Sequence, residues 1–129
     1  MGGTVRTRTR RKPVGREFLL ALWKVHILHH AGEEPVVGAW IIRELRGHGY
    51  EVSPGTLYPL LARMESHGWL RSRADPDAGP RARKEYTLTR DGRAVLALLR
   101  RQVDELYHEV VVGGRAPEAT RRAGGRAAP

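Results

Sequence analysis

The chain has 129 residues, with 23 Lys and Arg against 14 Asp and Glu, and no cysteine. This length fits one domain with a modest core, and the lack of cysteine excludes disulfides and thiolate metal sites. The longest apolar run, residues 18–23, is too short to span a membrane and no signal-peptide pattern precedes it, so we expect a cytoplasmic protein.

The net charge of +9 belongs to the two ends of the chain. Residues 1–16 hold six basic and no acidic residues, and residues 113–129 hold four basic residues and one acidic residue, which leaves the part between them net zero. We expect a disordered basic arm over 1–14 and a disordered tail over 113–129. Such tails touch nucleic acid or acidic partners without specificity.

The first helix is predicted over residues 17–31 and ends at Gly32. Its apolar residues lie nearly all round, which indicates a helix buried between two surfaces. We assign Phe18 and Leu22 to a dimer interface. Trp23 of this helix, with Trp40 of the next, could line an effector pocket in a dimer, although aromatic residues on apolar helix faces more often fill a core.

The second helix is predicted over residues 36–46, and the third over 54–67. Ser53 is placed to cap the third helix, and Pro54 occupies a position where a missing N–H costs nothing. Gly55 and Thr56 leave the first-turn N–H groups approachable, which favours phosphate binding.

The third helix has two distinct faces. Its apolar stripe consists of Leu57, Leu60, Leu61 and Met64. Tyr58 and Arg63 lie on the opposite face, where Tyr58 offers a hydroxyl and a ring and Arg63 can pair with guanine or phosphate. A helix face of this kind can also be merely solvated.

A hairpin follows, with strands predicted over 69–74 and 81–88 around the turn cluster 75–80. Its cations form a basic wing. Alternation along a strand would send Arg81 and Arg83 to one side and Lys84 to the other. Clustered charges usually mark a solvated face, but these bracket the third helix, so phosphate contact is the better interpretation.

The last helix is predicted over 89–112, capped by Thr89. Its apolar residues recur at steps of 4, 4, 3 and 4, which is the spacing of a coiled-coil seam. The seam predicts dimerisation through Val95, Leu99, Val103, Leu106 and Val110.

Three helices and a two-stranded wing predict a winged helix-turn-helix, mainly α with a small β-hairpin. We expect a DNA-binding domain over 15–88 and a dimerisation helix over 89–112. Four stretches carry a family resemblance: they are Gly38 with 41–45, then 53–61, 63–70 and 84–92. In these four stretches, the chain resembles the PadR family of bacterial transcriptional regulators, of the short type with one C-terminal dimerisation helix.

The resemblance covers roughly residues 17–112, and its most specific part is Ser-Pro-Gly-Thr-Leu-Tyr-Pro at 53–59. It implies a homodimeric transcriptional regulator, most often a repressor, on a palindromic double-stranded DNA operator. A ligand or metal sensor, whose DNA binding is switched by a small-molecule effector of unknown identity or by a metal, is a refinement of this function that the sequence leaves open. Two departures occur: residues 37–40 replace the family's usual helix start, and Glu85 replaces an aromatic residue of the wing. We expect Glu85 to weaken the wing's contact with phosphate.

The expected DNA contacts combine the third helix and the wing: Ser53, Gly55, Thr56, Tyr58, Arg63, Arg81, Arg83 and Lys84. The alternative class is a winged-helix protein-interaction module that acts through its coiled-coil helix, which the net-zero middle of the chain and Glu85 would favour. Sharp, salt-dependent binding to one operator would separate the two.

His26, His29 and His30 share one arc of the first helix. The four-residue step suits a metal, but histidines near a helix C-terminus also interact favourably with its dipole. We predict no metal and no cofactor. No nucleophile elbow, phosphate-cradling glycine loop or pair of carboxylates occurs, so the chain is predicted not to be an enzyme.

Overall fold

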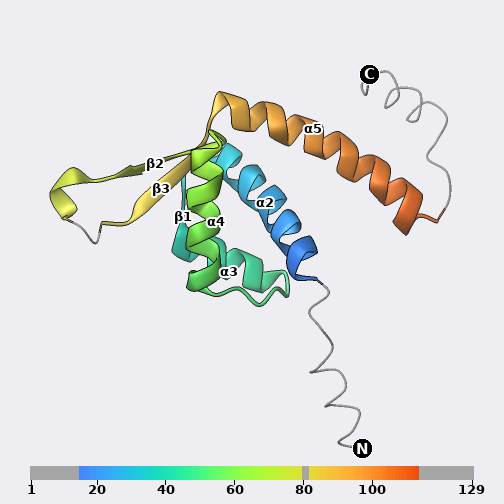
Figure 1. Cartoon of the computed structure of the whole chain (residues 1–129), viewed down its shortest axis with the longest axis horizontal. Coiled ribbons are helices and arrows are strands. Elements are labelled where there is room, and N and C mark those ends of the chain that lie inside the picture. The colour runs from blue at the N-terminus through green and yellow to red at the C-terminus, as the bar shows by residue number, and fades with distance from the viewer. Residues whose placement is uncertain (1–14, 80–81, 114–129) are drawn as a thin grey trace, which may run out of the picture.

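The computed structural model describes residues 15–79 and 82–113. The predicted basic arm, Arg81 and nearly all of the predicted tail lie outside these residues. Six helices and strands carry the fold. In chain order they are α2 (Arg16–Glu33), α3 (Gly38–Gly47), α4 (Pro54–Ser66), β2 (Leu70–Ala74), β3 (Lys84–Leu88) and α5 (Arg90–Leu106), arranged as in Figure 1. The predicted class, mainly helical with a small sheet and winged, is confirmed.

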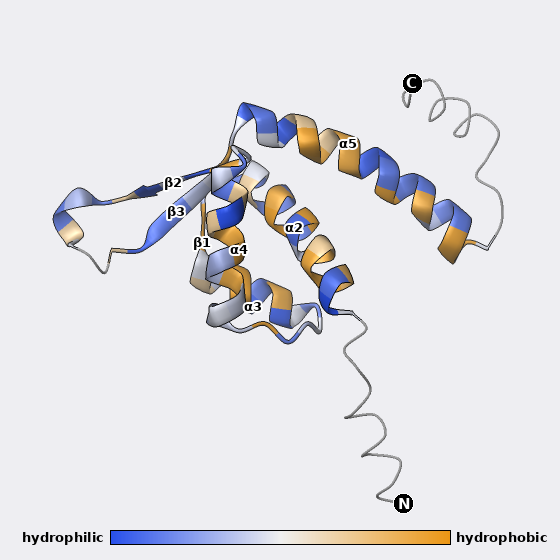
Figure 2. Ribbon diagram, viewed as in Figure 1, coloured by the Kyte–Doolittle hydropathy of each residue, from blue (hydrophilic) through white to orange (hydrophobic). Residues whose placement is uncertain are grey.

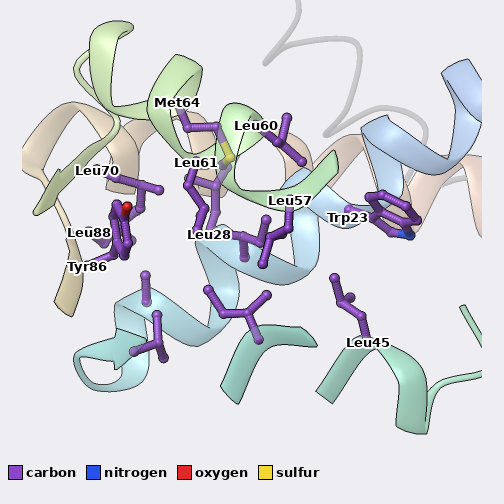
Figure 3. Packing of buried hydrophobic residues seen from close by; sticks show 14 of the residues in the cluster. Trp23, Leu28, Leu45, Leu57, Leu60, Leu61, Met64, Leu70, Tyr86 and Leu88 are labelled. Carbon is purple, nitrogen blue, oxygen red and sulfur yellow. The ribbon is translucent and has the colours of Figure 1, made fainter. Parts of the chain in front are cut away.

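The core lies where α2, α3, α4 and the hairpin meet (Figure 3). All four residues of the predicted stripe on α4 are fully buried. They pack with Leu28 of α2, Leu45 of α3 and Leu88 of β3. The helical period of the apolar residues therefore set the inner face of α4, because burial of that stripe removes the most apolar area from water.

The sheet has three strands and not the two that the sequence predicts. The additional strand is β1 (Val36–Val37), which pairs antiparallel with β3 in the order β1-β3-β2. Its register sets Val36 opposite Tyr86 and Val37 opposite Glu85. The prediction of helix from residue 36 was wrong, because two β-branched valines reach the open edge of β3 and satisfy their backbone groups there.

Within one chain, only part of α2 is buried, whereas the sequence predicts a helix buried between two surfaces. Trp23, Ile27 and Leu28 are buried in the C-terminal two-thirds of the helix. Phe18 and Leu22, near its start, are 61% and 46% exposed. No other element of the described chain covers them, so this end of α2 presents an apolar surface to solvent.

The α5 helix begins as predicted, with Thr89 as its cap. The Thr89 Oγ1 accepts the Gly92 N–H at 2.9 Å and donates to the Gly68 carbonyl at 2.5 Å. This pair of bonds joins the segment between α4 and β2 to the start of α5. The helix then runs away from the domain and continues as a π-helical turn, Tyr107–Val111 (Figure 1).

No helix among the described residues is long and apolar enough to cross a bilayer.

Candidate nucleic-acid interface

The N-terminus of α4 is open to solvent, although its cap differs from the prediction. Ser53 stands at the cap position, but its hydroxyl donates to Thr56 Oγ1 at 3.3 Å and accepts no helix N–H. The Ser53 carbonyl instead accepts the Thr56 and Leu57 N–H groups, at 3.1 and 3.0 Å. Gly55 lies in open space, where an added Cβ would meet only Ser53 Oγ at 3.9 Å. A phosphate can therefore approach the positive end of the helix dipole.

The exposed face of α4 has small residues at its centre and long ones at its edges. Gly55, Ala62 and Ser66 are exposed along the middle of this face. Tyr58 and Arg63 are also exposed, but five helical steps of about 100° place them about 140° apart. The sequence predicts that Tyr58 and Arg63 both project from the face opposite the apolar stripe. In the structure they lie at the two edges of that face, on either side of a surface of small residues.

Tyr58 is positioned by Gly38, the first residue of α3. A Cβ built on Gly38 would lie 2.4 Å from Tyr58 Cε1, so only glycine lets the ring pack this closely. Tyr58 still remains 43% exposed. The contact joins the start of α3 to the second turn of α4 and fixes the direction of the Tyr58 ring.

A groove of about 390 Å³ runs beside Tyr58 between α4 and the wing. Arg83 and Lys84 line it from the wing, and Ala62 lines it from α4. Tyr86 lies at its inner wall, where burial, with smaller effects from Glu65 and Tyr58, raises the pKa of the phenol. The geometry thus brings two of the predicted wing cations to the same groove as Tyr58.

The two faces of the wing carry different charges. Lys84 shares its side of β3 with the buried Tyr86 and Leu88. Glu85 projects to the other side, opposite Arg73 in the register of the two strands. Opposite charges at facing positions stabilise a sheet by about 0.2–1 kcal/mol. Glu85 and Lys84 point to opposite faces, so the expectation that Glu85 weakens phosphate contact stays a prediction for the face that carries Glu85.

Arg83 precedes β3, which begins at Lys84 and not at residue 81 as predicted. Strand alternation therefore does not govern Arg83, and it lines cavities on both faces of the wing.

Two polar contacts that sequence reasoning missed hold α4 in place. The Arg46 guanidinium donates to the Val52 carbonyl from Nε at 3.2 Å and from Nη2 at 2.8 Å, which ties α3 to the turn before α4. The Glu65 carboxylate accepts the Ser72 N–H at 3.0 Å and the Ser72 hydroxyl at 2.9 Å, which ties α4 to the wing. Both residues look like solvated helix positions in the sequence, so no local signal predicts these bonds.

The predicted histidine cluster changes its membership in the structure. His29 turns toward α5, where its Nδ1 lies 3.4 Å from Arg100 Nη2. His26 and His30 instead lie with His48, the residue after α3. Burial lowers the pKa of His26, and the nearby His48 and His30 add to this effect. Burial likewise lowers the pKa of His30, against an opposing contribution from Glu44. Both shifts favour neutral imidazole.

The two tryptophans considered for an effector pocket contact different aromatic neighbours. Trp23 is buried in the core with its ring edge toward Tyr50, and its Nε1 has no hydrogen-bond acceptor among the described residues. Trp40 is partly buried and packs edge-on against His30, with ring centroids 5.1 Å apart. Their surroundings are those of packed side chains.

Comparison with known proteins agrees with this geometry. The sequence profile of the Transcriptional regulator PadR-like family matches residues 27–98, which include α3, α4 and the wing. The chain is 51% identical over 98 residues to "Transcriptional regulator Rv3488" of Mycobacterium tuberculosis, covering 76% of this chain and 91% of that protein.

Solved structures show the same fold. A PadR-like transcription factor from Bacteroides fragilis superposes with a TM-score of 0.66 at 29% identity, over 80% of this chain and 100% of that one. A PadR family regulator from Eggerthella lenta gives 0.61 at 32% identity, over 75% and 88%. These are regulators and not enzymes, as predicted. On its profile match and its winged-helix geometry, the chain belongs to the PadR-like family of DNA-binding transcriptional regulators.

Proposed function

We propose that the protein is a cytoplasmic homodimer that represses transcription by binding a palindromic operator, with α4 in the major groove and the wing along the phosphate backbone. The observation that supports this most is the exposed face of α4. Its small central residues allow close approach to base edges, and Tyr58, Arg63 and the wing cations surround them.

The dimer is proposed from apolar side chains that remain exposed. Figure 2 shows apolar residues along the length of α5, well beyond the part that meets α2. Near its start, the same side of α5 buries Leu96 against the domain. The apolar residues farther along this side of α5 are not covered by other residues of the same described chain: Leu106 is 57% exposed and Val110 is 64% exposed. Exposed apolar surface of this kind marks an interface.

The predicted seam divides into two parts with different environments. Val95 and Leu99 are partly buried and pack against the core of their own chain. Val103, Leu106 and Val110 are exposed, as are Phe18 and Leu22 on α2. We propose that the exposed five form the contact with a second copy, α5 of one protomer meeting α2 and α5 of the other. A two-fold dimer would then present two α4 helices to two half-sites.

The test of this function is selection of bound duplexes from a random pool with the full-length protein. The expected result is an enriched inverted repeat whose half-sites are about 10 base pairs apart, centre to centre. Repression is checked by placing the selected site across a promoter that drives a reporter. A pool that shows no sequence enrichment, or an enriched site without two-fold symmetry, would contradict the proposal.

Arg63→Ala is expected to weaken binding to the selected operator by about 1–3 kcal/mol and to relax preference at one base pair of each half-site. The physical reason is loss of a guanidinium at the rim of the α4 face. Equilibrium titration of labelled operator and of single-base variants measures both effects. Arg101→Ala, on exposed α5, is the control and should bind as the wild type does. Unchanged affinity and specificity in Arg63→Ala would remove Arg63 from the interface.

Lys84→Gln and Glu85→Gln form a matched pair for the wing. Each removes one charge from neighbouring residues on opposite faces of β3. Lys84→Gln is expected to weaken binding to all sequences alike and to reduce the slope of log affinity against log salt by about 1, since one phosphate contact is lost. Glu85→Gln is expected to change affinity by less than about twofold, because screening attenuates charge effects across the wing. Equal and opposite effects of the two changes would show that both side chains face DNA.

A further inference from the structure

Three histidines from two separate segments converge outside the DNA-binding surface. His26 and His30 lie one turn apart on α2, and His48 follows the C-terminus of α3. One ring nitrogen from each lies within 4.8 Å of the others. The Glu44 carboxylate, in the last turn of α3, reaches His30 and His48 of this cluster.

Two distances to the Glu44 carboxylate are close to those of a metal coordination shell. His30 Nε2 lies 3.5 Å from Glu44 Oε2, and His48 Nε2 lies 3.1 Å from the same oxygen. In a tetrahedral zinc site with bonds of about 2.0–2.1 Å, donor atoms stand about 3.3–3.4 Å apart. The Glu44 carboxylate oxygen therefore already lies at nearly the required separation from one nitrogen of His30 and from one nitrogen of His48.

His26 completes the set. Its ring stacks on His30, with centroids 6.3 Å apart and planes 12° from parallel, and lies 4.7 Å from the His48 ring. The three ring nitrogens all lie within 4.8 Å of one another, which is at most about 1.5 Å beyond the ideal separation. Rotation of a partly exposed ring can supply such a movement. His29 does not take part, because it faces Arg100.

We propose that His26, His30 and His48, together with Glu44, form a binding site for Zn²⁺ that ties α2 to the end of α3. Three imidazoles and one carboxylate are a donor set that suits this ion. Bound zinc would link the helix that carries Phe18 and Leu22 to the segment that leads into α4. The competing explanation is a stack of aromatic rings without a ligand.

The test is calorimetric titration of ZnCl₂ into the full-length chain, free of any polyhistidine tag and without DNA. The expected result is one ion per chain, with a dissociation constant in the micromolar range or tighter. His48→Gln and His26→Gln should each weaken binding by at least about 10-fold, since each removes one of four ligands. His29→Gln is the matched control, a neighbouring histidine on the same helix, and should bind zinc as the wild type does.

A second measurement keeps the test independent of side effects on folding. Zinc binds the folded site, so saturating ZnCl₂ should raise the midpoint of thermal unfolding of the wild type and of His29→Gln, and should not raise that of His48→Gln. The proposal is overturned if the wild type binds no zinc, or if His29→Gln loses as much affinity as His48→Gln. Since no DNA is present, these outcomes do not depend on the proposed function.

Discussion

Replacing both Val103 and Leu106 with aspartate is expected to make the protein monomeric. The two side chains are 46% and 57% exposed in one chain, so the change should leave the fold of each chain intact. In the proposed dimer these side chains would be buried. Transfer of an unpaired carboxylate from water into an apolar interface costs several kcal/mol, which would destabilise the dimer. Leu99 is a poorer site for the test, because it packs against its own core.

Sedimentation equilibrium measures the outcome directly. The wild type should have twice the chain mass of 14.5 kDa, and the double variant should have that mass alone. Operator affinity should fall by at least about 100-fold, because the second half-site contact is no longer intramolecular. Arg101→Asp places a charge change on the opposite side of α5 and serves as the control. A wild-type mass equal to one chain would refute the dimer.

Gly92→Ala is expected to be the most damaging small substitution in the described chain. An added Cβ would lie 2.2 Å from the Trp69 carbonyl oxygen and 2.5 Å from Leu88 Cδ1. The carbonyl cannot move freely, because it accepts the Thr89 N–H at 3.0 Å. We expect a loss of about 3 kcal/mol in the free energy of unfolding, at the upper end for an overpacked core. The helix propensity of alanine, about 1 kcal/mol better than that of glycine, would offset only part of the strain.

Urea and thermal unfolding at one protein concentration provide the measurement, since oligomerisation makes apparent stability depend on concentration. Gly47→Ala is the matched control. It ends α3, where an added Cβ meets nothing within 4 Å, and it should be neutral or slightly stabilising. If Gly92→Ala unfolds at the wild-type midpoint, α5 does not meet the wing in the way described.

The elements that the sequence predicted well are those defined by neighbours in the chain. The buried stripe of α4 follows from its helical period, and the start of α5 follows from Thr89, whose hydroxyl accepts the Gly92 N–H three residues later. The wing is predicted by the cluster of turn residues at 75–80, which separates two short segments predicted as strands. Each of these features depends on local geometry alone, which a sequence pattern contains.

The contacts that only the tertiary structure decided join residues far apart in the chain. Val36 forms a strand because the edge of β3 lies beside it, and Glu85 faces Arg73 because of the register of the hairpin. His48 joins the α2 histidines in place of His29, although it lies 18 residues after His30. Tyr58 is directed by the missing Cβ of Gly38. A helical or strand period fixes which face a side chain occupies, but only the packing of complete elements fixes what that face meets.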